Sequence, residues 1–208
     1  MTAIELKQAI LDHRGTFTCS RIHQPKETKQ VEFRHEITPP GDTSDLQSLP
    51  DVGRLREFYA VFGGITFYVD EKSGDAARFI APPEAWSELA EEFNRWCHIV
   101  GPEEREEYFP DWVETCLVIG EEPRTGNYIL MPVEGSEAGA VYHFEHDGFE
   151  FERHADDLLQ YAAKLLDLDD RGLAYIATHM RFIEDDSPAQ WWIESLQDNR
   201  GNQARTEV

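Results

Sequence analysis

The chain has 208 residues, a length typical of one domain, and its 40% hydrophobic and 12% aromatic content is enough to build a core, which excludes global disorder. Its 41 acidic residues outnumber its 19 basic ones, so the formal net charge is −22. A field of this sign repels phosphate backbones and anionic membranes, and we therefore expect neither direct nucleic-acid binding nor membrane association.

The N-terminal part of the chain alternates between short predicted elements. Residues 2–12 have the pattern of a short helix, and residues 16–22 and 30–37 that of two strands, with a turn at 25–27. Residues 39–45, Pro-Pro-Gly-Asp-Thr-Ser-Asp, indicate an exposed loop or linker.

The middle of the chain is predicted to hold two longer helices around a strand pair. A helix over 50–62 ends at Gly63-Gly64, and short strands follow at 65–69 and 77–81. Trp86, Leu89, Phe93 and Trp96 recur at helical spacing, so a second helix begins at Pro82-Pro83. We expect 103–107 to be an acidic solvated loop and 108–112 an aromatic loop.

The remaining segments predict four strands and at least two helices. Strands are expected at 115–120, 127–133, 139–146 and 149–152, with a hairpin turn at Asp147-Gly148, and a helix at about 155–167. Residues 172–183 fit a strand, a helix or both, 188–196 fit a helix, and 198–208 read as a frayed end. Because strands occur in groups, we predict a single α+β domain with a central twisted, mainly antiparallel sheet flanked by helices.

Catalytic and metal-binding patterns are absent from the sequence. There is no phosphate loop, no Gly-x-Ser-x-Gly and no HExxH, and His13, His23 and His35 are isolated along the chain. His143 and His146 are three apart on a strand and would face opposite sides. We therefore expect no enzyme activity, no cofactor and no metal.

Two further features favour a soluble, cytoplasmic protein. The longest apolar runs are far shorter than the roughly 18–20 residues of a membrane span, and residues 1–11 lack the pattern of a secretory signal. Cys19, Cys97 and Cys116 are widely spaced and form no CxxC pair, which favours a reduced compartment.

Several segments in a fixed order resemble a known family. A helix ending in Phe62-Gly63-Gly64 is followed by Leu117-Val118-Ile119-Gly120, a polar turn and a strand from Gly126, then Ala140-Val141-Tyr142-His143-Phe144 and a helix from Ala155. This order resembles the SUKH superfamily, which includes the fungal Smi/Knr cell-wall regulators and many bacterial immunity proteins. Phe62 stands where the family has Asn, and Asp156-Asp157 replace its Ser-Phe pair.

The resemblance covers roughly residues 50–167 and implies a domain organisation. We expect a helix and strand extension at 1–45, a SUKH-like core at 46–167, a C-terminal extension packed on the core at 168–198, and a disordered tail at 199–208.

The resemblance also implies a non-enzymatic role, the neutralisation of a cognate toxin by binding it. Nuclease toxins tend to be basic, so an acidic inhibitor gains on-rate by electrostatic steering. The alternatives are an intracellular scaffold of the Smi/Knr type and a small-molecule-binding protein. Candidate partner-binding residues are acids on predicted loops and an aromatic loop: Asp70, Glu71, Asp75, Glu103, Glu104, Glu106, Glu107, Tyr108, Phe109, Trp112, Glu121 and Glu122.

Overall fold

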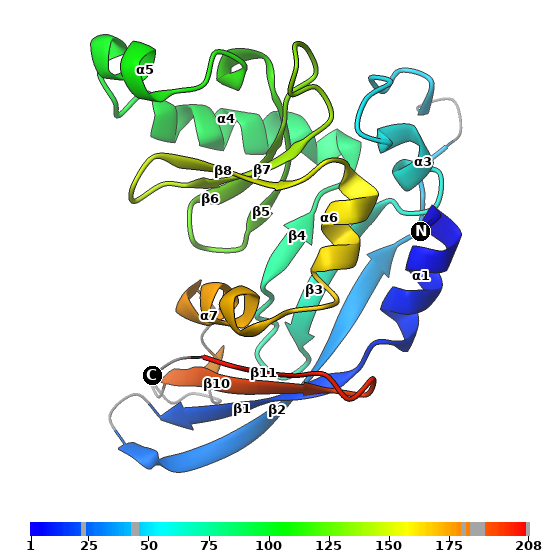
Figure 1. The fold of residues 1–208 in the computed structure, drawn as a ribbon, viewed down its shortest axis with the longest axis vertical. Helices are drawn as coiled ribbons and strands as arrows, with labels where there is room; N and C mark the ends of the chain where they lie inside the picture. Colours follow the sequence, from blue (N-terminus) through cyan, green and yellow to red (C-terminus); the bar gives the residue numbers. More distant parts are fainter. Residues whose placement is uncertain (22–23, 43–45, 180–181, 184–189, 207–208) are drawn as a thin grey trace.

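An antiparallel sheet runs through the whole chain (Figure 1). The computed structural model describes residues 1–21, 24–42, 46–179, 182–183 and 190–206. Ten strands follow one another in the order β11-β10-β1-β2-β3-β4-β5-β6-β7-β8, and β9 pairs with β10. The strands are β1 (Gly15–Arg21), β2 (Gln24–Thr38), β3 (Gly64–Asp70), β4 (Arg78–Ile80), β5 (Leu117–Glu122), β6 (Asn127–Met131), β7 (Val141–Glu145), β8 (Glu150–Ala155), β9 (Phe182–Ile183), β10 (Gln190–Asp198) and β11 (Gln203–Arg205).

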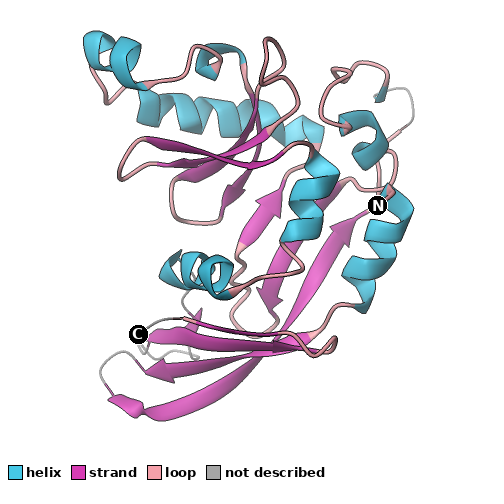
Figure 2. Cartoon of the chain, viewed as in Figure 1, coloured by secondary structure: helices cyan, strands magenta, loops and turns pink. Residues whose placement is uncertain are grey.

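Helices lie on both faces of this sheet, which confirms the predicted α+β class (Figure 2). Phe93 of α4 packs edge-on against Phe144 of β7, whereas Tyr175 of α7 contacts His143, the neighbouring residue on that strand. Because successive strand residues face opposite sides, α4 and α7 cover opposite faces of the β5–β8 region. The helices are α1 (Ala3–Asp12), α3 (Leu55–Tyr59), α4 (Trp86–Cys97), α5 (Pro102–Tyr108), α6 (Leu158–Lys164) and α7 (Asp170–His179).

Strand β4 joins the two halves of the sheet and is one of its shortest strands. This strand has three residues, and its pairing with β5 is limited to Phe79 with Glu121 and Ile80 with Gly120. A side chain at Gly120 would place its Cβ only 2.2 Å from the carbonyl oxygen of Phe79, so glycine is required for the strands to approach. The two halves of the sheet therefore depend on a short ladder with little backbone pairing.

Two predicted segments have a different structure. Residues 103–107 form most of helix α5 and not a loop, because Pro102 begins the helix and Glu103 and Glu104 lie near its positive N-terminal end. The predicted turn at 25–27 lies within β2.

The C-terminal end also differs from the prediction. Residues 190–198 form strand β10 and not a helix; 188 and 189 lie outside the described residues. A bulge between Ile193 and Ser195 breaks the alternation, so buried Ile193 and Leu196 are three apart and mimic a helical spacing. Strand β11 pairs with β10, so the prediction of a disordered tail is wrong for residues 203–205.

Other expectations agree with the structure. Helices α1, α4 and α6 and the hairpin β7–β8 around Asp147-Gly148 are confirmed. The domain boundaries at 45/46 and 167/168 stay predictions, although the sheet continues across both. Among the described residues, no helix combines the length and apolar character needed to cross a membrane.

A buried chain of hydrogen bonds ties the two ends of the chain together. His13 follows α1, His35 lies on β2 and Asp198 ends β10, so these residues are not isolated as the sequence suggested. The backbone N–H of Tyr68 donates to His35 Nδ1 at 3.1 Å, which places the His35 proton on Nε2. That nitrogen lies 2.8 Å from His13 Nδ1, and His13 Nε2 lies 3.1 Å from Asp198 Oδ2. Each donor thus meets an acceptor while both imidazoles are neutral.

This chain predicts a loss of stability in mild acid. Burial lowers the pKa of His35 to about 3 and also lowers that of His13, where the Asp198 hydrogen bond acts in the opposite direction. The unfolded chain therefore binds protons more readily, so the stabilisation is complete above the ordinary pKa of 6.5 and falls as pH falls toward about 3. From pH 6.5 to 5, His35 alone accounts for a loss of about 2 kcal/mol in unfolding free energy.

Urea unfolding of the wild type and His35→Gln at both pH values checks this prediction. Glutamine keeps an acceptor for Tyr68 but does not titrate, so the variant should lose about 2 kcal/mol less than the wild type over this interval. His98→Gln, an exposed position, is the control and should follow the wild type. Equal pH slopes for the wild type and His35→Gln would contradict the assignment.

Candidate functional site

Four of the predicted acidic residues lie together on α5 at one end of the molecule (Figure 1). Glu103, Glu104, Glu106 and Glu107 are all exposed, and the helix has no buried residue. Tyr108 at its end is 64% exposed, and Ile99 just before it is 68% exposed. Few large apolar side chains are so exposed in the described part of the protein. The region of α5 therefore places exposed carboxylates next to exposed apolar groups.

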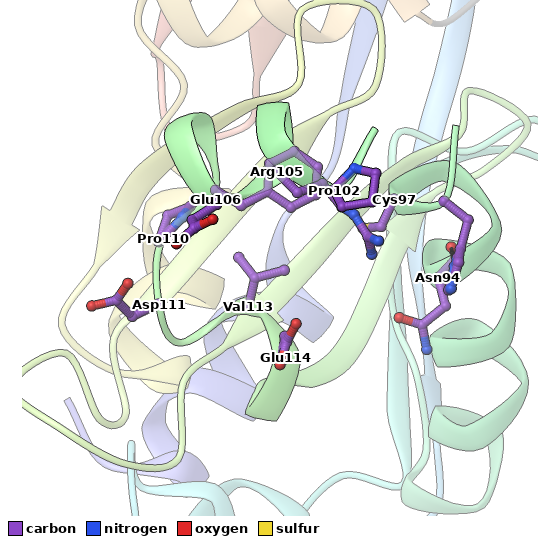
Figure 3. Close-up of a pocket in the computed structure, with 11 residues that line it drawn as sticks. Asn94, Cys97, Pro102, Arg105, Glu106, Pro110, Asp111, Val113 and Glu114 are labelled. Carbon is purple, nitrogen blue, oxygen red and sulfur yellow. Dashed lines mark hydrogen bonds between the residues drawn. The ribbon is translucent and has the colours of Figure 1, made fainter. Parts of the chain in front are cut away.

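A pocket of about 460 Å³ lies beneath α5 (Figure 3). It opens between the end of α4 and the segment that follows α5. Its apolar lining includes Pro102, Phe109 and Val113, and three carboxylates line it as well, those of Glu106, Asp111 and Glu114.

Arg105 is the one arginine or lysine among the residues lining this pocket. Its guanidinium points toward Cys97 in Figure 3. The Arg105 Nε atom is buried without a hydrogen-bond partner in the described structure. Burial raises the pKa of the Cys97 thiol to about 11, with Arg105 acting in the opposite direction, so this thiol is neutral. The pocket therefore combines a cationic interior with several carboxylates.

The predicted aromatic loop is mostly packed against the sheet. Phe109 contacts Phe151 with ring centroids 5.3 Å apart, and Trp112 contacts Tyr142 at 4.5 Å. Both side chains are half-buried, so of the three aromatic side chains in this segment only Tyr108 is exposed. Phe109 and Trp112 instead hold the chain that follows α5.

Three of the predicted contact residues are buried, which corrects the expectation that they form an exposed surface. Asp70 is 5% exposed and accepts hydrogen bonds from the backbone N–H groups of Lys72 and Ser73, as turn aspartates do. Asp75 is 5% exposed and forms an ion pair with Arg124. Glu122 is 1% exposed.

The other two acids are also partly engaged. Glu71 is exposed but lies 2.7 Å from a guanidinium nitrogen of Arg34. Glu121 is half-buried, and its pKa is raised by burial and by Glu92 and Glu88 of α4. The predicted acidic loops therefore do not form one surface, and α5 is the one place that gathers several exposed carboxylates of the predicted set.

A second cluster lies on the opposite face of the sheet and was not predicted from the sequence. Glu121 and Glu122 are consecutive strand residues, so Glu122 faces away from α4. Its carboxylate forms an ion pair with Arg78 of β4, lies 3.1 Å from His143 Nε2, and accepts a 2.8 Å hydrogen bond from Asn127 Nδ2. Arg78, Glu122 and His143 are each at most 2% exposed.

Helix α7 completes this cluster through Tyr175. The Tyr175 hydroxyl lies 2.7 Å from His143 Nε2, and the Arg78 guanidinium lies 4.9 Å from the centre of the Tyr175 ring. Burial lowers the pKa of His143, although the hydrogen bond to Glu122 acts in the opposite direction. A neutral His143 beside the ion pair leaves the cluster without excess charge.

The strand alternation expected for the two histidines is confirmed. His143 faces α7, whereas His146 packs on Trp96 of α4 with ring centroids 4.5 Å apart. In the described part of the chain, no group of three or more His, Cys, Asp or Glu side chains is arranged to hold a metal ion.

Comparisons with known proteins do not extend these observations. No family model, no curated protein and no solved structure matches the chain.

The buried ion pair predicts a strong energetic coupling. Removing one partner leaves an uncompensated buried charge, so Arg78→Met and Glu122→Gln should each lower the free energy of unfolding by about 3–5 kcal/mol. The double variant should lose about 2–3 kcal/mol less than the sum, because both charges disappear together. Urea unfolding of the four proteins measures this coupling.

The exposed pair of Arg95 and Glu92 on α4 provides the control. Its side chains are 74% and 42% exposed, so the corresponding cycle should give a coupling under about 0.5 kcal/mol. A coupling at Arg78 and Glu122 no larger than this would show that the buried pair does not hold the strands together.

Proposed function

We propose that the protein works by binding a basic protein partner through its α5 surface, defined as Ile99, Glu103, Glu104, Glu106, Glu107 and Tyr108. The observation that carries the proposal is the combination, on α5 and just before it, of four exposed carboxylates with two exposed large apolar side chains. Interfaces commonly centre on an aromatic anchor surrounded by polar groups, and Tyr108 with its acidic neighbours has this composition.

Helix α5 adds little to the stability of the fold. A short helix with no buried residue contributes almost nothing to the core, and four carboxylates within five residues repel one another. A basic partner would relieve this repulsion, and the overall charge of −22 would speed the encounter. Binding therefore accounts for a feature that the stability of the chain does not require.

The pocket beneath α5 suits a lysine side chain of the partner. Its methylene stem would lie along Phe109 and Val113, while the ammonium would stay near Glu106, Asp111 and Glu114. Because Arg105 occupies the interior, a cation is expected near the carboxylates rather than deep inside.

The finer proposal is that the partner is a toxin and the protein its immunity factor. It rests on the resemblance of residues 50–167 to the SUKH superfamily and on the acidic surface, which imitates the polyanion that a nuclease-like toxin holds. In this proposal the protein acts in the cytoplasm, without catalysis or cofactor, and blocks the toxin by direct contact.

Binding and protection can be measured with the product of a neighbouring gene that encodes a basic toxin domain. The variant with glutamine at 103, 104, 106 and 107 should bind with an on-rate at least about tenfold slower at low salt. It should also lose most of the salt dependence, because steering by charge is screened as ionic strength rises. Stopped-flow mixing measures the rate, and rescue of growth in toxin-expressing cells measures protection.

A control with the same change in charge separates the surface from the net field. Glutamine or asparagine at four exposed acids outside α5, Glu32, Asp42, Glu84 and Glu134, removes the same charge elsewhere. The proposal predicts a much smaller effect for this control. Equal effects of both variants would assign steering to the whole molecule, and several unrelated partners with ordinary salt dependence would indicate a scaffold instead.

A further inference from the structure

The turn between β10 and β11, residues 198–202, is hydrogen-bonded to the end of helix α1, and Figure 1 shows the two side by side. The Arg14 N–H donates to Asn199 Oδ1 at 3.1 Å, and the Asn199 N–H donates to the Arg14 carbonyl oxygen at 2.8 Å. Asn199 Nδ2 donates to the carbonyl oxygen of Asp12 at 2.7 Å. All three residues are exposed, so water competes for these hydrogen bonds and this contact is suited to local opening.

Behind this turn, each N–H of the buried histidine chain already faces an acceptor. The Tyr68 N–H donates to His35 Nδ1, and His35 Nε2–H donates to His13 Nδ1. His13 Nε2–H donates to Asp198. A proton added to His13 Nδ1 would face the His35 N–H across 2.8 Å, and a proton on His35 Nδ1 would face the Tyr68 N–H. The closed chain therefore has no place for another proton.

The charges around the two imidazoles do not stabilise an additional positive charge. Four charged side chains act on them from the surrounding segments, two acidic and two basic: Asp198, Asp167, Arg14 and Arg200. Burial alone would raise the pKa of Asp198, but hydrogen bonds from Asn202 and Arg200 lower it, so Asp198 stays ionised in mild acid. Burial raises the pKa of the Tyr68 hydroxyl, which is therefore neutral. The two signs balance, and hydrogen-bond geometry decides the response to a proton.

The backbone at Tyr68 depends on the same hydrogen bonds. Tyr68 lies within β3 with a φ of +57°, a conformation in which a large side chain is strained. Its N–H donates to His35, and its hydroxyl donates to the carbonyl oxygen of Leu165, just after α6. A proton on His35 Nδ1 would leave the Tyr68 N–H buried without an acceptor, at a residue that is already strained.

Helix α1 is the element of this cluster with the fewest constraints on its movement. Strand β2 pairs with β3 on both sides of His35, which fixes that imidazole in the sheet. His13 instead follows the last residue of α1. The start of the helix is tied to the α3 region, because Arg54 donates to the carbonyl oxygen of Met1 at 3.2 Å. The helix can therefore pivot about its first turn, and its C-terminal end, with Ile10, moves most.

We propose that the His13–His35 pair and the 198–202 turn form a pH-sensitive clasp: in mild acid an imidazole of the pair binds a proton, and the end of α1 detaches from the turn while strands β5–β8 stay folded. Detachment uncovers Ile10, which is fully buried in the closed form. The clasp shares no residue with the α5 surface, so the inference goes beyond the proposed partner binding. It is also distinct from the loss of global stability in acid, because most of the sheet remains folded.

Amide hydrogen exchange of the full chain at pH 6.5 and pH 5, followed by ¹H–¹⁵N NMR, tests the clasp. An imidazole that becomes accessible regains its ordinary pKa of about 6.5, so opening takes up at least one proton. The protection of the His13 and Asn199 amides, corrected for intrinsic exchange, should therefore fall at least about tenfold over this interval. About 1 M urea should change their exchange little, since local opening exposes little surface, whereas amides of the β5–β6 ladder should respond to urea.

Two variants separate the proton from the turn. His13→Gln/His35→Gln keeps a donor and an acceptor at each position but does not titrate, so its protection at pH 6.5 and pH 5 should differ less than about twofold. Asn199→Ala removes the side-chain hydrogen bonds to Arg14 and Asp12. It should lower the protection of the His13 amide about three- to tenfold at both pH values and leave their ratio unchanged. His98→Gln, at an exposed histidine, should match the wild type.

Protection of the His13 and Asn199 amides that does not depend on pH would overturn the proposal. A urea dependence equal to that of the β5–β6 amides at pH 5 would do so as well, because α1 would then detach only on global unfolding. An unchanged pH ratio in the double variant would have the same meaning. If the double variant does not fold, the urea comparison in the wild type and the ratio in Asn199→Ala still decide. Because no measurement involves the α5 surface, failure here leaves the proposed partner binding unaffected.

Discussion

The buried ion pair of Arg78 and Glu122 joins β4 to β5, where only a short backbone ladder connects the two halves of the sheet. Strand β4 contributes three residues, and Gly120 lets β5 approach it closely, so few backbone hydrogen bonds join the two halves. The buried pair adds a charge-assisted link at this point, and His143 and Asn127 extend it to β7 and β6. A buried ion pair is a poor source of net stability, but it discriminates strongly against any register that separates its members.

The acidity of the chain has two different uses in the structure. Asp70, Asp75 and Asp198 are buried or nearly so and satisfy backbone N–H groups or basic side chains, so they serve the fold. Among the described residues, the four α5 carboxylates form no ion pair, and Glu103 and Glu104 contribute only through their place at the N-terminal end of the helix. Net charge alone cannot separate these two groups, because a turn aspartate and a surface glutamate contribute equally to it. The exposed fraction of each carboxylate does separate them. Among the predicted contact residues, it leaves helix α5 as the element with several exposed acids.

The sequence predicted much of the fold because local patterns were strong. Trp86, Leu89 and Phe93 recur on one face and are all buried in α4, and Asp147-Gly148 sits in the β7–β8 hairpin. Strand β10 was missed because its bulge at Glu194 replaces alternation with a spacing of three. Helix α5 was read as a loop because it has no apolar face to produce a period.

The buried cluster was harder to foresee than any single element. Arg78, Glu122 and His143 lie on three strands distant in sequence, and in so acidic a chain one more glutamate carries no signal. One sequence pattern does bear on this cluster. If Glu121 and Glu122 lie on a strand, their side chains must point to opposite faces of the sheet. A sheet covered by helices on both faces then requires the inward carboxylate to have a partner.

The first and last parts of the chain pack against the central segment, residues 50–167. Residues 50–167 contain Arg78, Glu122 and His143, but Leu168, Tyr175 and Ile176, which line a cavity of about 380 Å³ beside Arg78, come from the segment that follows. That segment is held in place by contacts of α7 with β10 and β11, and β10 is joined to the N-terminal strands by pairing with β1 and through Asp198 and His13. The first and last segments are therefore not appendages on a central fold. Helix α7 covers the buried Arg78 and His143 through Tyr175, and together with α6 it lines a cavity beside Arg78.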